Sequence, residues 1–98
     1  MYEMLMAMNI TDDEKYTAYR AAMTPVLHAH GGSFGYDFKV SEVLISETPE
    51  PVNRVFTIRF PDTAAKDAFF SNADYLQIKA EYFNVSVSAV TMIADYQK

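Results

Sequence analysis

The fold is decided near the start of the chain, where residues 2–14 read YEMLMAMNITDDE. Every even position from Tyr2 to Ile10 is apolar, whereas the odd positions mix polar and apolar side chains, and this period of two predicts a β-strand. One face of the strand is fully apolar and the other is half apolar, so we expect cover on both sides. Thr11 then offers a helix cap, and Glu14 completes the pattern of a capping box. The sequence therefore predicts a strand that leads directly into a helix.

The rest of the chain continues with the same two periods. We expect the first helix to run to about His30, because Gly31 and Gly32 follow it and glycine favours helix ends. After Glu42 the alternation of apolar residues changes phase, which predicts a β-bulge in a long extended segment. The further strands are predicted at residues 34–45, 53–60 and 85–96. The second helical region is predicted at residues 61–83, with a cap at Asp62 or Thr63, an interruption at 71–72, and an inner face of Ala65, Ala68, Phe69, Leu76, Ala80 and Phe83.

The order β-α-β-β-α-β predicts an α+β, ferredoxin-like fold in a single domain, residues 1–98. Right-handed crossovers place both helices on one face of a four-stranded antiparallel sheet. The other face is left open, yet Leu5, Ala7 and Val55 put apolar side chains on it. An exposed apolar face usually marks an interaction surface. We therefore expect a homodimer that forms through the open sheet face.

Composition excludes several classes of partner. The chain has 98 residues, half of them hydrophobic, and a net charge of −5. This charge argues against binding to nucleic acid or to anionic lipid. No apolar stretch reaches the roughly 20 residues that a membrane span needs. The N-terminus lacks the basic region of a signal peptide, so a cytoplasmic location is expected.

Motifs for known cofactors and nucleophiles are lacking. The sequence holds no G-x-S-x-G, phosphate loop or dinucleotide fingerprint, so we expect no cofactor. Cysteine is absent, and His28 and His30 would face opposite sides of a helix, so we expect no metal site. Protonated histidines also suit the end of a helix structurally. A catalytic role would need a carboxylate from elsewhere, for example across the dimer.

Aromatic residues give the best indication of a binding site, with 7 Tyr and 7 Phe. Hydroxyls in an apolar pocket are typical of small-molecule sites, although tyrosines also bury their rings for purely structural reasons. Arg59 is the candidate anchor for an acidic group, since a guanidinium can hold a carboxylate through two hydrogen bonds. Its alternative role is an ion pair with Glu42, Glu47 or Asp95. The candidate ligand-binding residues are Tyr19, His28, Tyr36, Arg59, Tyr75 and Tyr82.

Several local patterns occur together in a recognisable order. They are Tyr16, Tyr19 and Pro25 in the first helix, Gly31-Gly32, Phe60-Pro61 before an alanine-rich helix start, and Asn72-Ala73-Asp74-Tyr75. With these features the chain resembles the domain-of-unknown-function family 1330, within the dimeric α+β-barrel superfamily. The resemblance implies a ferredoxin-like homodimer with no assigned activity. Arg59 stands where the family often has glutamate, and Tyr82 replaces a family arginine.

Three functions follow as hypotheses. The first is a homodimeric protein that binds an apolar or acidic small molecule in a pocket between sheet and helices. The second is a cofactor-independent oxygenase or an isomerase, of the kind the superfamily resemblance implies. In that case His28 or His30 would act as base, and Tyr75 or Arg59 would stabilise an enolate. The third is a purely structural or interaction module.

Overall fold

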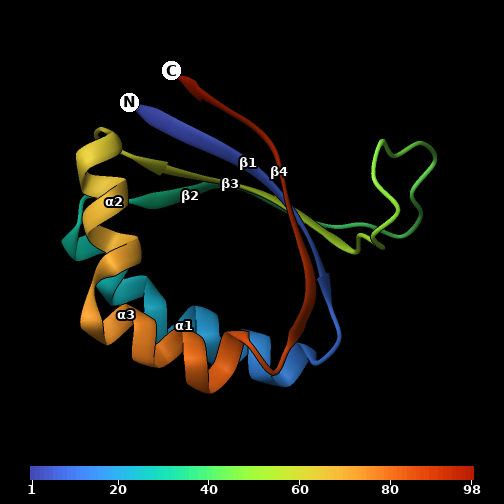
Figure 1. Cartoon of the computed structure of the whole chain (residues 1–98), viewed down its shortest axis with the longest axis horizontal. Coiled ribbons are helices and arrows are strands. Elements are labelled where there is room, and N and C mark those ends of the chain that lie inside the picture. Colours follow the sequence, from blue (N-terminus) through green and yellow to red (C-terminus); the bar gives the residue numbers. More distant parts are fainter.

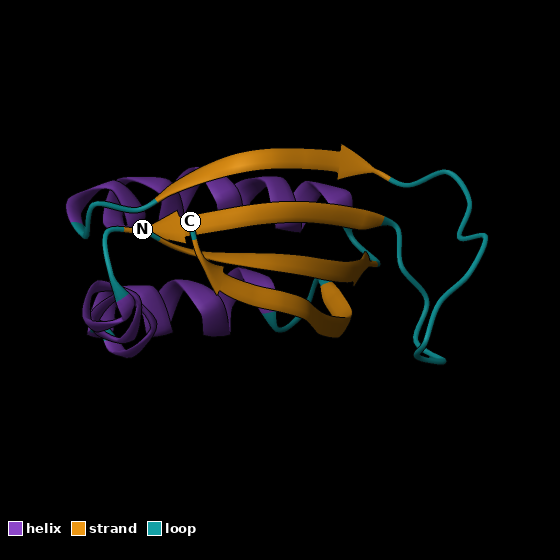
Figure 2. Ribbon diagram, turned by 90° about the horizontal axis from the view of Figure 1, so that it is seen from above, coloured by secondary structure: helices purple, strands orange, loops and turns teal.

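The whole chain folds into a four-stranded sheet with helices on one face. The computed structural model describes residues 1–98. The elements are β1 (Tyr2–Ile10), α1 (Asp13–Ala29), β2 (Ser33–Lys39), β3 (Arg54–Phe60), α2 (Thr63–Ser71), α3 (Ala73–Ile78), the π-helix η1 (Lys79–Phe83) and β4 (Val87–Gln97). The sheet is antiparallel in the order β2-β3-β1-β4. It bends around the helices, and its other face carries no element (Figures 1 and 2). The predicted ferredoxin-like α+β fold is confirmed. None of the helices combines the length and the hydrophobicity that a membrane-spanning helix requires.

The core lies between the sheet and the helices. The side chains at even positions of β1 and β3 point towards α1, as their alternation predicts. The buried side chains of α1 recur every three or four residues and pack against them. Each fully buried large apolar side chain contributes about 1.5–3 kcal/mol relative to an exposed one. The buried core residues are Tyr2, Met8, Ile10, Tyr16, Tyr19, Met23, Leu27, Phe56, Ile58, Phe60, Phe69 and Tyr75.

The start of α1 differs by one residue from the prediction. Asp12, not Thr11, is the cap: its carboxylate accepts a hydrogen bond of 3.0 Å from the backbone N–H of Lys15. Thr11 instead bonds to the turn that precedes β4, because both its N–H and its hydroxyl donate to the carbonyl of Ser86. Asp and Thr are both good caps, and this tertiary contact decides between them.

The end of α1 follows the prediction. Gly31 has a φ of 75°, in the left-handed region that glycine adopts without a steric penalty. The N–H groups of Gly31 and Gly32 donate to the carbonyls of His28 and Leu27, which is the hydrogen-bond pattern of a Schellman motif. A Cβ at Gly31 would also lie 2.7 Å from Cγ of Pro61. The glycine thus lets α1 end tightly against the start of α2.

The extended segment is shorter than predicted. β2 ends at Lys39, and Val43, Leu44 and Ile45 lie in an exposed loop of residues 40–53. The change of phase after Glu42 therefore marks the end of pairing and not a bulge. The register irregularity of this hairpin lies earlier, between Phe34 and Asp37. The loop projects away from the body of the molecule (Figures 1 and 2).

The base of this loop is held firmly. The N–H of Val40 donates to the carbonyl of Asn53 at 2.9 Å. The side-chain amide of Asn53 accepts from the N–H of Ile10 and donates to the carbonyl of Ile10, both at 2.8 Å. A side chain thereby replaces one backbone pair of the β1–β3 ladder. These hydrogen bonds hold the two ends of the loop next to each other, independently of the conformation of its tip.

The inner face of the second helical region is partly different from the prediction. Phe69 is buried as expected, but Ala68, Leu76 and Ala80 are exposed, and Tyr75 is the residue of α3 that enters the core. Tyr75 packs with its ring centre 4.4 Å from that of Phe69. The segment is apolar on two neighbouring faces, so its periodicity alone did not decide which one turns inward.

Candidate functional site

A cleft of about 390 Å³ lies between the helix-covered face of the sheet and the helices. This volume is at the small end of the range of about 300–1,000 Å³ for ligand pockets. Of the 16 lining residues 14 are hydrophobic, and the other two are Arg20 and Lys79. The lining residues come from every strand and helix: Met4, Met6, Met8, Tyr16, Tyr19, Arg20, Met23, Phe34, Phe56, Ile58, Phe70, Tyr75, Leu76, Lys79, Phe83 and Val90.

The methionine stripe of β1 forms one wall of the cleft. Of these even-numbered methionines, Met8 is buried whereas Met4 and Met6 are only partly buried, and all three border the cleft. Methionine side chains are unbranched and flexible, so they adapt to ligands of different shape. The wall can therefore accept an apolar molecule without a fixed outline.

Two tyrosine hydroxyls meet inside the cleft wall. The Oη atoms of Tyr19 and Tyr75 are 2.9 Å apart, and both residues are buried. Burial raises the pKa of both phenols. A tyrosine hydroxyl is already protonated at neutral pH, and burial strengthens this preference, so both hydroxyls serve as hydrogen-bonding groups and not as bases. The sequence prediction named both residues, and the structure brings them together.

Arg20 is the charged residue of the cleft that the sequence prediction missed. Its Nε donates to the hydroxyl of Tyr16 at 2.8 Å, and its Nη1 lies 3.2 Å from Oδ2 of Asp37. Its Cζ lies 3.8 Å from the centre of the Phe34 ring. Its Nη2 is buried and has no hydrogen-bond partner in the chain. The spacing of four between Tyr16 and Arg20 on a helix was the available signal.

The Asp37 carboxylate accepts hydrogen bonds from two guanidinium groups. Besides Arg20 it accepts from Nε and Nη2 of Arg54, at 2.7 and 2.8 Å. The hydrogen bonds from Arg54 and the charge of Arg20 hold the pKa of the Asp37 carboxyl below its usual range. The cluster of Arg20, Asp37 and Arg54 thus has two positive charges and one negative charge.

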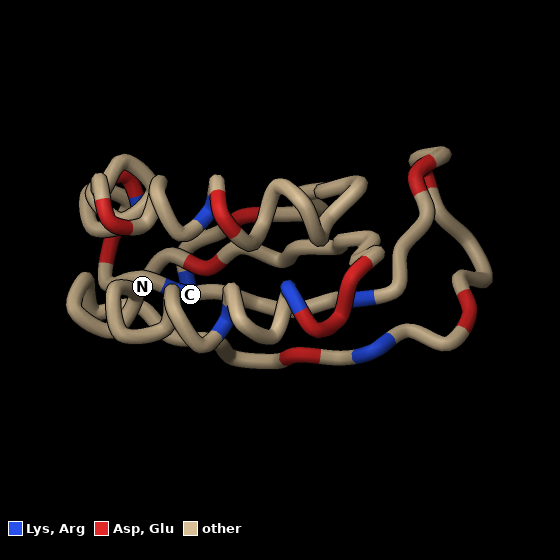
Figure 3. The backbone as a smooth tube through the Cα atoms, turned by 90° about the horizontal axis from the view of Figure 1, so that it is seen from below, with Lys and Arg blue, Asp and Glu red and all other residues tan.

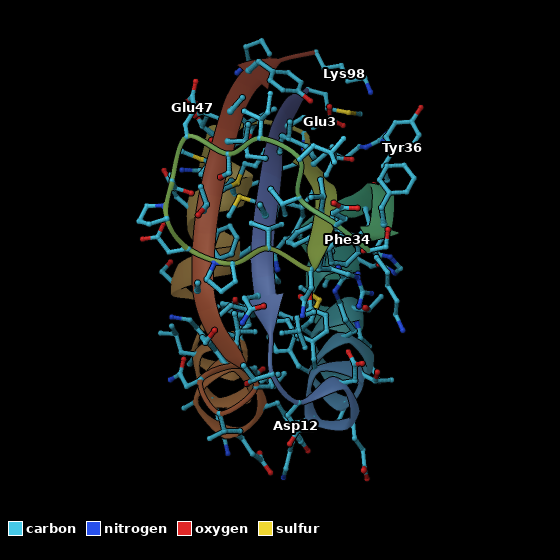
Figure 4. The ribbon with its side chains drawn as sticks, turned by 90° about the vertical axis from the view of Figure 1, so that its right-hand side faces the viewer. Glu3, Asp12, Phe34, Tyr36, Glu47 and Lys98 are labelled. Atoms are coloured by element: carbon cyan, nitrogen blue, oxygen red, sulfur yellow. The ribbon has the colours of Figure 1, made fainter.

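Two predicted residues lie on the open face of the sheet. Tyr36 is exposed and stacks on Phe38 with ring centres 5.8 Å apart. Arg59 pairs with none of the three carboxylates considered for it. Its partner is Glu3, whose Oε1 lies 3.5 Å from Nε of Arg59. Neither residue lines the cleft. Figure 4 shows Tyr36 on the outer side of β2.

Glu3 is the centre of a polar cluster on this open face. The Tyr96 hydroxyl donates to Oε2 of Glu3 at 2.5 Å, and Nζ of Lys98 lies 3.5 Å from Oε1. Figure 4 shows Glu3 and Lys98 at the same end of the sheet. The hydrogen bond from Tyr96 lowers the pKa of the Glu3 carboxyl, and the charges of Lys98 and Arg59 act in the same direction. The cluster explains how a carboxylate that is only 2% exposed lies on an otherwise mixed sheet face.

The remaining predicted residues lie outside the cleft lining. His28 is exposed near the end of α1, and Tyr82 is half-buried on η1. Nδ1 of His30 is 2.8 Å from the carbonyl oxygen of Val26. Neither histidine therefore lies where a base for the cleft would be needed. Figure 3 shows basic and acidic residues interspersed over the helix side of the molecule.

The fold and the cleft together define a ferredoxin-like α+β protein with an apolar site between its sheet and its helices. The chain belongs to the family described as domain of unknown function (DUF1330), whose model matches residues 2–96. No curated protein matches the chain.

Solved structures support the same class. A protein of unknown function from Rhodopseudomonas palustris is 20% identical with a TM-score of 0.81, over 99% of this chain and 81% of that one. A dabb family protein with a ferredoxin-like fold from Mesorhizobium loti is 15% identical with a TM-score of 0.70, over 99% and 95%. An uncharacterized NIPSNAP domain protein from Burkholderia xenovorans is 9% identical with a TM-score of 0.70, over 100% and 94%. At these identities the likeness concerns the fold.

Proposed function

We propose that the protein binds a small, largely apolar molecule in the cleft between sheet and helices. The observation that carries this proposal is the cleft itself, with a volume of about 390 Å³ and 14 hydrophobic residues among its 16. A module that serves only as structure has no need of such a space, because protein interiors pack to the density of organic crystals. The cleft therefore favours ligand binding over the purely structural hypothesis.

A ligand screen tests this proposal directly. Aromatic and aliphatic compounds of suitable size, both acids and their neutral analogues, are added to the protein and its thermal unfolding is followed. A ligand at 100 times its Kd stabilises the folded state by about 2.7 kcal/mol, which is readily measured. If no compound of either kind raises the melting temperature, the proposal is wrong.

A pair of variants locates the binding. Val90 borders the cleft and Val85 does not, and both are largely exposed, so a tryptophan at either position leaves the core intact. Val90→Trp is expected to weaken binding of any ligand found, because the indole fills part of the cleft. Val85→Trp is the matched control and is expected to bind normally. Equal weakening by both variants would place the ligand elsewhere.

The oxygenase and isomerase hypotheses gain no support from the histidines. Neither His28 nor His30 lines the cleft, so neither is placed to act as the base that these hypotheses require there. Binding is therefore the function that the geometry supports best.

We further propose that two copies associate through the open sheet face. Tyr36 and Phe38 are 61% and 56% exposed on this face, and Leu44 and Ile45 of the projecting loop are 84% and 94% exposed. Such a collection of exposed apolar side chains is typical of an interaction surface. A Bacteroides fragilis protein of unknown function with a ferredoxin-like fold is described as dimeric (TM-score 0.52, 10% identity).

Size-exclusion chromatography with light-scattering detection tests the association, because it measures the molar mass of the protein in solution. The expected mass is twice the 11.1 kDa of one chain. Phe38→Asp is expected to give the monomer, because it places a charge within the apolar face. Ala68→Asp makes the same kind of change at an exposed position of α2 and should leave the dimer intact. A wild-type monomer would contradict this proposal without affecting the cleft.

A further inference from the structure

We infer that the ligand of the cleft is an amphipathic anion, with a carboxylate or similar head group bound by Arg20 and an apolar body among the methionines and aromatic rings. This inference rests on the proposed binding function and names the chemical class of the ligand. It also replaces Arg59, which lies on the other face of the sheet, as the anchor for an acidic group.

The charges in the cleft wall have one sign. Arg20 and Lys79 are its only charged residues, and no carboxylate borders the space. The chain as a whole has a net charge of −5. The two cations in the wall disfavour a cationic ligand and attract an anionic one locally, whereas the net negative charge of the chain acts in the opposite sense at longer range.

Arg20 has binding capacity that the chain itself does not use. Asp37 satisfies its Nη1 but is shared with Arg54, and the Tyr16 hydroxyl satisfies its Nε. Its Nη2 is buried without a partner, and a buried unpaired donor of this kind lowers stability. After a small shift of the guanidinium that opens Nη2 to the cleft, a carboxylate there would supply the acceptor and balance the second positive charge of the cluster.

The guanidinium is also held in place for this role. It lies against the Phe34 ring at 3.8 Å and the Phe56 ring at 4.9 Å, and the Tyr16 hydroxyl and the Asp37 carboxylate fix its orientation. An anchor whose rotamers are already restricted loses little entropy when it binds a ligand. Lys79, whose side chain is flexible and half-exposed, has only a longer contact of this kind, with its Nζ 5.9 Å from the centre of the Phe83 ring.

The test compares an acid with its isosteric neutral amide. Binding of 2-naphthoate and 2-naphthamide, and of decanoate and decanamide, is measured by calorimetry at neutral pH with the wild-type protein. Charge-assisted hydrogen bonds are stronger than neutral ones by an amount that corresponds to about tenfold in Kd. We expect at least one acid to bind about tenfold more tightly than its amide, and this preference to decrease with added salt.

Variants identify the anchor. Arg20→Gln is expected to remove the preference for the acid and to retain binding of the amide, whereas Lys79→Gln retains both. Binding of the acid is also expected to shift the Nε–H resonance of Arg20 in wild-type protein, which is informative even if Arg20→Gln does not fold.

Each contrary outcome has a distinct meaning. Equal binding of acid and amide by the wild type would overturn the anionic ligand but leave the proposed binding function standing. A preference lost in Lys79→Gln and kept in Arg20→Gln would overturn the role of Arg20. If neither the acids nor the amides bind, this inference fails for the probes used, and if the wider screen also finds no ligand, the proposed function fails with it.

Discussion

The paired hydroxyls of Tyr19 and Tyr75 give a sharp test of how the cleft wall is held together. The perturbation is removal of one hydroxyl at a time, in Tyr19→Phe and Tyr75→Phe, and of both in the double variant. Each hydroxyl has the other as its only partner in the chain, at 2.9 Å. A single change therefore leaves the remaining hydroxyl buried and unpaired, whereas the double change leaves two apolar rings.

The expected magnitudes follow from this geometry. An unpaired buried hydroxyl costs about 1–3 kcal/mol, while replacement of both partners by apolar groups of the same shape is nearly neutral. Each single variant should lower the free energy of unfolding by about 1–2 kcal/mol, and the double variant by no more than either single one. In a domain of this size each kcal/mol corresponds to about 4–8 °C in melting temperature.

The assay is urea unfolding followed by far-UV circular dichroism, analysed as a double-mutant cycle. Tyr36→Phe is the matched control, since the Tyr36 ring is exposed and its hydroxyl makes no hydrogen bond in the chain, so it should cost almost nothing. Additive effects of the two changes would refute the reasoning, because they would mean that the hydroxyls act separately. Two neutral single variants would also refute it, and would indicate that water in the cleft satisfies either hydroxyl.

Three further predictions concern the rest of the fold. Asp12→Ala should lower stability to urea by about 1 kcal/mol through loss of the α1 cap, and Thr11→Ala by less, because Thr11 does not cap the helix; the opposite order would restore the sequence-based assignment. Gly31→Val should lower the melting temperature more than Gly31→Asn, because asparagine tolerates a φ of 75° better, although both meet Pro61; equal losses would mean that the contact alone matters. The Asp37 carboxyl has a lowered pKa in the folded state, so its stabilisation is present above the unfolded pKa of about 3.9 and is lost as pH falls through the folded value. Asp37→Asn should therefore cost about 0.5–1 kcal/mol at neutral pH, a modest value because the side chain is partly exposed, and almost nothing once the pH lies below the lowered pKa of the folded state; a cost independent of pH would exclude the ion pairs as its cause.

Much of the fold was predictable because the strands and helices differ clearly in period. The first strand was predicted with its observed ends, and the end of α1 was predicted from Gly31-Gly32. The exposed triplet Val43, Leu44 and Ile45 was not predictable in the same way. Three consecutive apolar residues indicate a strand, and the sequence does not show that this segment has no neighbouring strand to pair with. A similar ambiguity affected residues 73–83, where two neighbouring faces are apolar.

The site was less predictable, because it depends on which side of the sheet each strand residue faces. Tyr36 and Arg59 are suitable in kind but lie on the open face, while Tyr19 and Tyr75 lie in the cleft wall. Arg20 was overlooked because a single arginine on a helix usually lies in solvent. Its role depends on Phe34 and Asp37, which are more than a dozen residues away in sequence and become neighbours only after β2 has paired.

The two hydrogen bonds between the side chain of Asn53 and the backbone of Ile10 affect how this protein can be re-engineered. Because these hydrogen bonds and the Val40–Asn53 hydrogen bond close the loop at its base, residues 41–52 can be exchanged without disturbing the strands, and the exchange also removes Leu44 and Ile45 from the proposed association surface. Loop-closure entropy changes slowly with length, so grafts of quite different size should be accepted. A recognition sequence or a reporter inserted there would be displayed on a rigid stem, well separated from the cleft.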